Sequence, residues 1–113
     1  MPTELLPPEA FREGRLLRDG VWVVAFLADW CPFCRRFRPS FEALDGGSAF
    51  RTGIADLSDD GSALWDQFRI EVVPAIVVFS NGRPVDRQES DPGVGLPSHA
   101  LTRARAAATG VGK

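Results

Sequence analysis

The segment 21–28 contains apolar residues only, in the order Val-Trp-Val-Val-Ala-Phe-Leu-Ala. A strand with one face in water alternates apolar and polar residues, whereas a strand covered on both faces is apolar throughout. The segment is also far too short to cross a bilayer as a helix. It therefore predicts a buried central strand in a sheet that has helices on both faces.

Other patterns predict the elements around this strand. Apolar residues at helical spacing, and polar caps such as Ser98, indicate helices. β-Branched runs indicate strands, and Asn81-Gly82 between two of them indicates a tight hairpin whose polar return strand lies at a sheet edge. Helices are predicted for residues 8–20, 33–44, 63–68 and 98–108, and strands for residues 51–57, 75–79 and 85–89.

The order of these elements predicts the fold class. Parallel crossovers followed by an antiparallel hairpin give an α/β fold with three layers, α/β/α, around a central mixed β-sheet. The chain has 113 residues, a length that suits one domain. We expect this domain to span residues 1–113, with residues 1–7 and 109–113 frayed.

Composition excludes several function classes. A net charge of −2, with 44% hydrophobic and 25% charged residues, is typical of a globular domain and argues against disorder and coiled coils. The chain has no strongly basic field, so nucleic-acid binding is a poor interpretation. Residues 1–8 show no basic segment followed by an apolar one, so we expect no secretory signal, no membrane association and a cytoplasmic location.

The two cysteines, Cys31 and Cys34, follow the predicted central strand at the start of the next helix. A disulfide scaffold uses more cysteines at wider spacing, so this pair indicates redox chemistry or a metal site. Structural zinc needs four ligands, and the single histidine, His99, lies far along the chain. We expect no metal within one chain and no catalytic part for His99. A metal shared across a dimer, or two inert buried thiols, are the minor alternatives.

The start of a helix is a favourable place for thiol chemistry. Unpaired backbone N–H groups and the positive end of the helix dipole stabilise a thiolate there. We therefore assign Cys31 as the nucleophile. Cys34 comes one helical turn later, where it can attack a mixed disulfide at Cys31, and we assign it as the resolving, more buried thiol.

Three motifs occur together along the chain. They are residues 26–34 (Phe-Leu-Ala-Asp-Trp-Cys-Pro-Phe-Cys), the helix proline Pro39, and residues 73–82 (Val-Pro-Ala-Ile-Val-Val-Phe-Ser-Asn-Gly). In this combination the chain resembles the thioredoxin family. The resemblance implies the thioredoxin fold, with a cis-proline at Pro74 before the penultimate strand. The substrate-binding residues that it implies are Trp30, Pro32, Phe33, Val73 and Pro74.

The same resemblance implies an activity. The chain would be a thiol–disulfide oxidoreductase, a thioredoxin-like reductase that acts on protein disulfides by dithiol–disulfide exchange. It would need no cofactor beyond a redox-active Cys31–Cys34 disulfide. We expect a monomer that a separate reductase recycles.

Some positions depart from the family pattern. Thioredoxins usually carry a buried carboxylate where this chain has Ala25, and the lysine paired with it should fall near Ala55, which is not basic either. Loss of the carboxylate and the lysine together makes energetic sense, because either one alone would be an unpaired buried charge, which costs several kcal/mol. The sequence then does not identify the group that takes the proton from Cys34. Our interpretation is that water or a backbone-held network accepts it. The segment 90–93, Ser-Asp-Pro-Gly, stands where a glycine normally follows the last strand.

Two alternative functions stay open. Pro32-Phe33 is similar to the glutaredoxin motif, which favours a glutathione-dependent oxidoreductase, although we find no convincing clamp for the glutathione carboxylates. The second alternative is a non-catalytic module of the same fold that uses the two cysteines to hold a metal or a partner.

Overall fold

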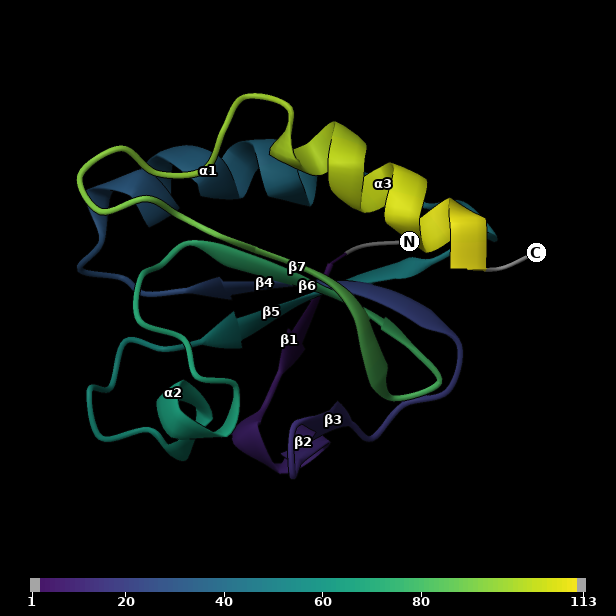
Figure 1. The fold of residues 1–113 in the computed structure, drawn as a ribbon, viewed down its shortest axis with the longest axis horizontal. Coiled ribbons are helices and arrows are strands. Elements are labelled where there is room, and N and C mark those ends of the chain that lie inside the picture. Colours follow the sequence, from purple (N-terminus) through teal and green to yellow (C-terminus); the bar gives the residue numbers. More distant parts are fainter. Residues whose placement is uncertain (1–2, 112–113) are drawn as a thin grey trace.

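Within residues 3–111, which the computed structural model describes, a five-stranded mixed sheet forms the centre of the molecule (Figure 1). Its strands are β1 (Glu4–Leu6), β4 (Val21–Leu27), β5 (Arg51–Asp56), β6 (Ala75–Ser80) and β7 (Arg83–Glu89). They lie side by side in the order β1-β5-β4-β6-β7. β1, β5 and β4 run parallel, whereas β6 and β7 are antiparallel to their neighbours.

The apolar segment that begins at Val21 forms the middle strand of this sheet, as predicted. β4 pairs with β5 on one side and with β6 on the other. Successive side chains of a strand point to opposite faces, so Ala25 and Leu27 face one layer while Val24 and Phe26 face the other. All four side chains are buried. Cover on both faces therefore explains why the segment is apolar throughout.

Helices cover both faces of the sheet (Figure 1). α1 (Pro32–Glu42) and α3 (Ala100–Val111) lie together on one face, and the short α2 (Ala63–Gln67) lies on the other. The predicted three-layer class with a mixed sheet is confirmed. Within the part of the chain that the structure describes, no helix is long and apolar enough to cross a membrane.

The prediction of a helix over residues 8–20 is wrong. A single 3₁₀ turn, Pro8–Ala10, leads instead into a two-stranded hairpin of β2 (Phe11–Arg12) and β3 (Arg15–Leu16). The hairpin turn is built on Glu13 and Gly14, whose φ angles of 51° and 76° are not helical.

Packing of Phe11 explains why this hairpin forms. Its ring lies 5.8, 5.4 and 6.3 Å, between centroids, from the rings of Phe26, Phe68 and Phe79. These contacts place Phe11 in the aromatic core on the α2 face of the sheet. Tertiary packing therefore outweighs the helical spacing of apolar residues in the local sequence.

The ends of the chain are more regular than predicted. Residues 4–6, expected to fray, form β1 and pair in parallel with β5. Residues 109–111, also expected to fray, complete α3. Residues 1–2 and 112–113 of the same prediction lie outside the described residues. α3 begins at Ala100, slightly later than the predicted start at Ser98.

The hairpin between β6 and β7 is confirmed. Asn81 and Gly82 have φ angles of 48° and 89°, the left-handed values that a tight hairpin turn requires and that these two residue types adopt readily. β7 pairs only with β6, and most of its side chains are exposed. The return strand is therefore the polar edge strand that the sequence predicts.

Candidate active site

The turn from β4 into α1 places both cysteines at the helix N-terminus. Cys31 is the N-cap residue, with φ −92° and ψ 113°, and Pro32 occupies the first helical position. The backbone N–H of Cys34 donates to Cys31 Sγ over 3.2 Å. A backbone donor aimed at a sulfur is one of the groups that stabilise a thiolate.

Both thiols are free and buried, with 4% of Cys31 and 2% of Cys34 exposed. Burial raises the pKa of the Cys34 thiol to about 12, and its hydrogen bond with the Cys31 side chain contributes to the rise. The positive charge of Arg35 acts in the opposite direction but more weakly. Cys34 is therefore a protonated and shielded thiol at neutral pH.

The segment before β6 lies against Cys31. The Cys31 thiol donates to the carbonyl oxygen of Val73 over 3.5 Å, and the Val73–Pro74 peptide bond is cis. The buried Ser90 hydroxyl donates to the carbonyl oxygen of Pro74 over 2.6 Å. Sequence analysis missed this contact, because Ser90 follows β7 and only the folded sheet brings it to Pro74.

Trp30 extends the surface beside Cys31. It is 53% exposed, and its indole N–H donates to the Ser58 carbonyl oxygen over 3.0 Å. Its ring stacks on that of Trp65, with 6.3 Å between centroids and 12° between planes. Trp65 donates in turn to the Asp59 carbonyl oxygen over 3.1 Å. Trp65 is thus half-buried and supports Trp30.

Phe33 bounds the other side of Cys31. The Arg36 guanidinium lies 5.7 Å from the centre of its ring. A Cβ added to Gly95 would lie 3.0 Å from the same ring, so the loop after β7 passes close to it. A pocket of about 360 Å³ separates Phe33 from Pro74. The structure thus brings Val73 and Pro74 beside the motif that contains Trp30, Pro32 and Phe33.

Metal ligation was the other chemistry that the cysteine pair allowed. Among residues 3–111, no group of three or more His, Cys, Asp or Glu side chains is placed to hold a metal ion. His99 is exposed and directly precedes α3.

Comparison with known proteins decides the family. Residues 3–96 match the family model described as thioredoxin. The chain belongs to the thioredoxin family. A thioredoxin of Staphylococcus saprophyticus is 32% identical over 72 residues, which cover 63% of this chain and 69% of the relative. Human protein disulfide-isomerase A6 is 29% identical over 104 residues, which cover 88% of this chain and 23% of that protein.

Solved thioredoxin structures share the fold. Thioredoxin f from spinach chloroplast has a TM-score of 0.74 at 19% identity, covering 95% of this chain and 86% of that chain. A mutant thioredoxin from Halobacterium salinarum has a TM-score of 0.68 at 26% identity, with coverages of 96% and 93%. Together with the paired cysteines, the relatives identify this thioredoxin-family protein as a protein disulfide oxidoreductase.

Two alanines lie where the family resemblance implies charged residues, a carboxylate at Ala25 and a lysine near Ala55. Ala25 and Ala55 are fully buried. In the sheet Ala25 pairs with Ile54, and Ala55 pairs with Phe26. Directly paired residues share a face, so Ala25 and Ala55 lie on opposite faces of the sheet, and each places a methyl group in the core.

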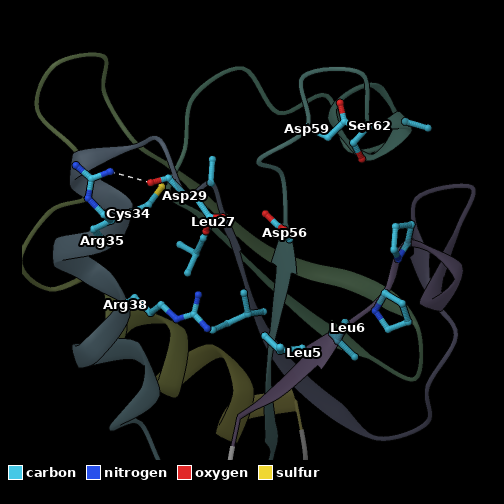
Figure 2. Close-up of a pocket in the computed structure, with 15 residues that line it drawn as sticks. Leu5, Leu6, Leu27, Asp29, Cys34, Arg35, Arg38, Asp56, Asp59 and Ser62 are labelled. Carbon is cyan, nitrogen blue, oxygen red and sulfur yellow. Dashed lines mark hydrogen bonds between the residues drawn. The ribbon is translucent and has the colours of Figure 1, made fainter.

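A pocket of about 630 Å³ lies behind Cys34 (Figure 2). We call it the rear pocket. α1 contributes Cys34, Arg35 and Arg38 to its wall, and the end of β5 contributes Asp56. Sequence analysis did not find it, because the register between β4 and β5, which decides the side of the sheet on which Asp56 lies, is not visible in the sequence.

Proposed function

We propose that this protein reduces disulfide bonds of protein substrates, with Cys31 as the nucleophile and Cys34 as the resolving thiol. The observation that carries the proposal is the pair of thiols at the start of α1, where Cys31 caps the helix and accepts a hydrogen bond from the Cys34 N–H. This arrangement gives the two thiols different tasks, because Cys31 caps the helix beside the Val73 carbonyl, whereas burial, with a contribution from the hydrogen bond to Cys31, raises the pKa of Cys34 to about 12.

The exchange has two steps. The Cys31 thiolate attacks one sulfur of the substrate disulfide, and the other substrate sulfur leaves and takes up a proton. Cys34 then loses its proton and attacks the Cys31 sulfur of the mixed disulfide, which releases the second substrate thiol. The substrate gains two electrons, and the protein is left with a Cys31–Cys34 disulfide.

The surface around Cys31 supports binding of an extended substrate segment. The Val73 carbonyl already lies 3.5 Å from Cys31 Sγ, so the backbone at Val73 can pair with a substrate backbone beside the reacting sulfur. Exposed Trp30 and half-buried Phe33 flank this place. We assign substrate contact to Trp30, Pro32, Phe33, Val73 and Pro74.

The proposal includes the conditions in which the protein works. The oxidised pair needs electrons from a separate reductase, and no cofactor takes part in the exchange itself. A reducing compartment such as the cytoplasm suits a thiol pair of this kind. We propose that the protein acts there as a monomer.

Reduction of insulin tests the proposal. With dithiothreitol as electron source, the protein should accelerate precipitation of the insulin B chain well above the dithiothreitol background. Cys31→Ser should abolish the acceleration. Cys34→Ser should trap mixed disulfides at Cys31, which mass spectrometry would identify. Insulin reduction no faster than with dithiothreitol alone would reject the proposal.

Replacing dithiothreitol by glutathione distinguishes the glutaredoxin-like alternative, which the Pro32-Phe33 pair favours. Turnover with glutathione and glutathione reductase as the electron source would support that alternative. We expect turnover with a thioredoxin-type reductase instead.

A further inference from the structure

We infer that Asp56 accepts the proton that Cys34 releases, through water in the rear pocket, in the second step of the exchange. The inference rests on the proposed function, because it assigns a positioning residue to a step of that reaction. It gives the protein a proton acceptor on β5 in place of a buried carboxylate on β4.

Cys34 needs such an acceptor. It is 2% exposed, so its thiol does not meet bulk water at the surface. Ala25, where the family resemblance implies a buried carboxylate, is fully buried and carries no ionisable group. A buried thiol attacks slowly unless its proton has a path to a base.

The rear pocket provides the path. Both Cys34 and Asp56 line it, and its volume is about 630 Å³. A water molecule occupies about 30 Å³ of liquid, so the pocket has room for a chain of several. In Figure 2 the Cys34 sulfur and the Asp56 carboxylate both lie at the border of this space.

The register of the sheet places Asp56 on the correct face. Leu27 pairs with Asp56, and Ala25 pairs with Ile54. Side chains two residues apart share a face, and directly paired residues share it too. Asp56 therefore lies on the same face as Ala25, the face that α1 covers, one strand over and two residues further along.

Hydrogen bonds hold the Asp56 carboxylate in place. Its Oδ1 accepts from the Ser58 N–H over 2.8 Å and from the Ser58 hydroxyl over 2.5 Å. The Ser58 Oγ accepts in turn from the Asp29 N–H over 2.8 Å. Asp56 is thus fixed through Ser58 to the turn that leads into the cysteine motif, while its side chain is exposed to solvent.

The other charged groups of the rear pocket are Arg35, Arg38, Asp29 and Asp59. Arg35 Nη1 donates to the Asp29 carbonyl oxygen over 2.8 Å, and its charge favours the Cys34 thiolate (Figure 2). Arg38 pairs with Glu42 over 3.3 Å. Asp59 lies in the loop before α2, where its Oδ1 accepts from the Gly61 N–H over 2.8 Å. Of the three carboxylates, Asp56 is the one that the strand register places on the Cys34 face.

The step balances without any other reactant. The Cys34 S–H bond breaks and its proton passes through water to Asp56. The Cys34 sulfur forms a bond with Cys31 Sγ, and the bond between Cys31 and the substrate sulfur breaks. The leaving substrate thiolate then takes a proton from Asp56 or from solvent. The two cysteines are oxidised and the substrate is reduced.

The test of the inference uses 5,5′-dithiobis(2-nitrobenzoate) as the disulfide substrate of the fully reduced protein. The first thionitrobenzoate released reports attack by Cys31, and the second reports attack by Cys34 on the mixed disulfide. In Asp56→Asn, which keeps the Oδ1 acceptor for Ser58, the second release should slow about tenfold at pH 7 while the first is unchanged. Formate should accelerate the second release in Asp56→Ala but not in the wild type.

Asp59→Asn is the matched control, because Asp59 accepts a backbone N–H two residues on in the same way that Asp56 does. It should leave both releases unchanged. Equal second-release rates in wild type and Asp56→Asn would overturn the inference, and so would slowing of both releases together, which indicates a displaced active-site turn.

A measurement on the wild type keeps the inference testable if the Asp56 variants do not fold. With a carboxylate acceptor, the second release should rise less than about tenfold per pH unit between pH 6 and 8. A full tenfold rise per unit means hydroxide takes the proton and overturns the inference. Failure of the proposed function would look different, since the first release and insulin reduction would be missing.

Discussion

Cys31 and Cys34 lie one helical turn apart but face two different regions of the molecule. The front region, around Cys31, presents the Val73 carbonyl and the rings of Trp30 and Phe33. The rear pocket, behind Cys34, carries carboxylates and guanidinium groups and has no contact with the Val73 segment. The proposed substrate contact and the proposed proton transfer therefore involve different residues, so each can be changed without the other.

Thiol alkylation should show the largest difference between the two regions. Only a thiolate reacts, and with a pKa of about 12 roughly one Cys34 in 10⁵ is ionised at pH 7. We expect iodoacetamide to label Cys31 more than about 1,000-fold faster than Cys34 in the reduced protein. Mass mapping after brief labelling would measure the ratio. Preferential labelling of Cys34 would reverse the assigned roles.

The strand-to-helix turn of the front region was accessible from the sequence, because its signals are local, whereas Val73 was assigned through the family resemblance. An all-apolar segment and a helix start fix the strand-to-helix turn that holds Cys31 and Cys34. Asn81-Gly82 fixes the hairpin in the same way. Each of these features depends on neighbouring residues only, so the pattern predicts it without knowledge of the fold.

The rear pocket was not accessible, because it depends on pairing between distant strands. A shift of one residue between β4 and β5 would turn Asp56 to the other face of the sheet. The prediction of a helix where the N-terminal hairpin lies failed for a related reason. Helical spacing in residues 8–20 competes with the contacts of Phe11 in the aromatic core, and those contacts lie 15 or more residues away along the chain.

The pH dependence of the free energy of unfolding at high pH should report the ionisation of the Cys34 thiol. Its pKa rises from 9.0 to about 12 on folding, so its contribution to stability is complete below pH 9 and is lost as the pH rises toward 12. The chain has no tyrosine, and its single lysine is Lys113, so few other groups titrate in this window. We expect the free energy of unfolding to fall by up to about 1.4 kcal/mol per pH unit between pH 9 and 11.

Urea unfolding of the reduced protein at several pH values would measure this loss. Two controls lack the titrating thiol: the oxidised protein, in which the disulfide carries no proton, and Cys34→Ala. Both should lose less stability than the reduced wild type over the same range. An equal loss of stability in Cys34→Ala would mean that other groups cause it, and the burial of the Cys34 thiol would have no thermodynamic consequence.

Replacing Trp30 should give the smallest effect, and it is confined to the front region. The side chain is 53% exposed, so Trp30→Ala should change the free energy of unfolding by less than about 1 kcal/mol despite its stacking on Trp65. If Trp30 contacts substrate as proposed, a large protein substrate covers this ring, whereas 5,5′-dithiobis(2-nitrobenzoate) needs only Cys31. We therefore expect the KM for insulin to rise about threefold, with both thionitrobenzoate releases unchanged. Trp30→Phe keeps an aromatic face, so its KM for insulin should lie between those of the wild type and Trp30→Ala. If Trp30→Ala slowed the second release instead, the front region would also govern the Cys34 step, and the separation of the two regions would be wrong.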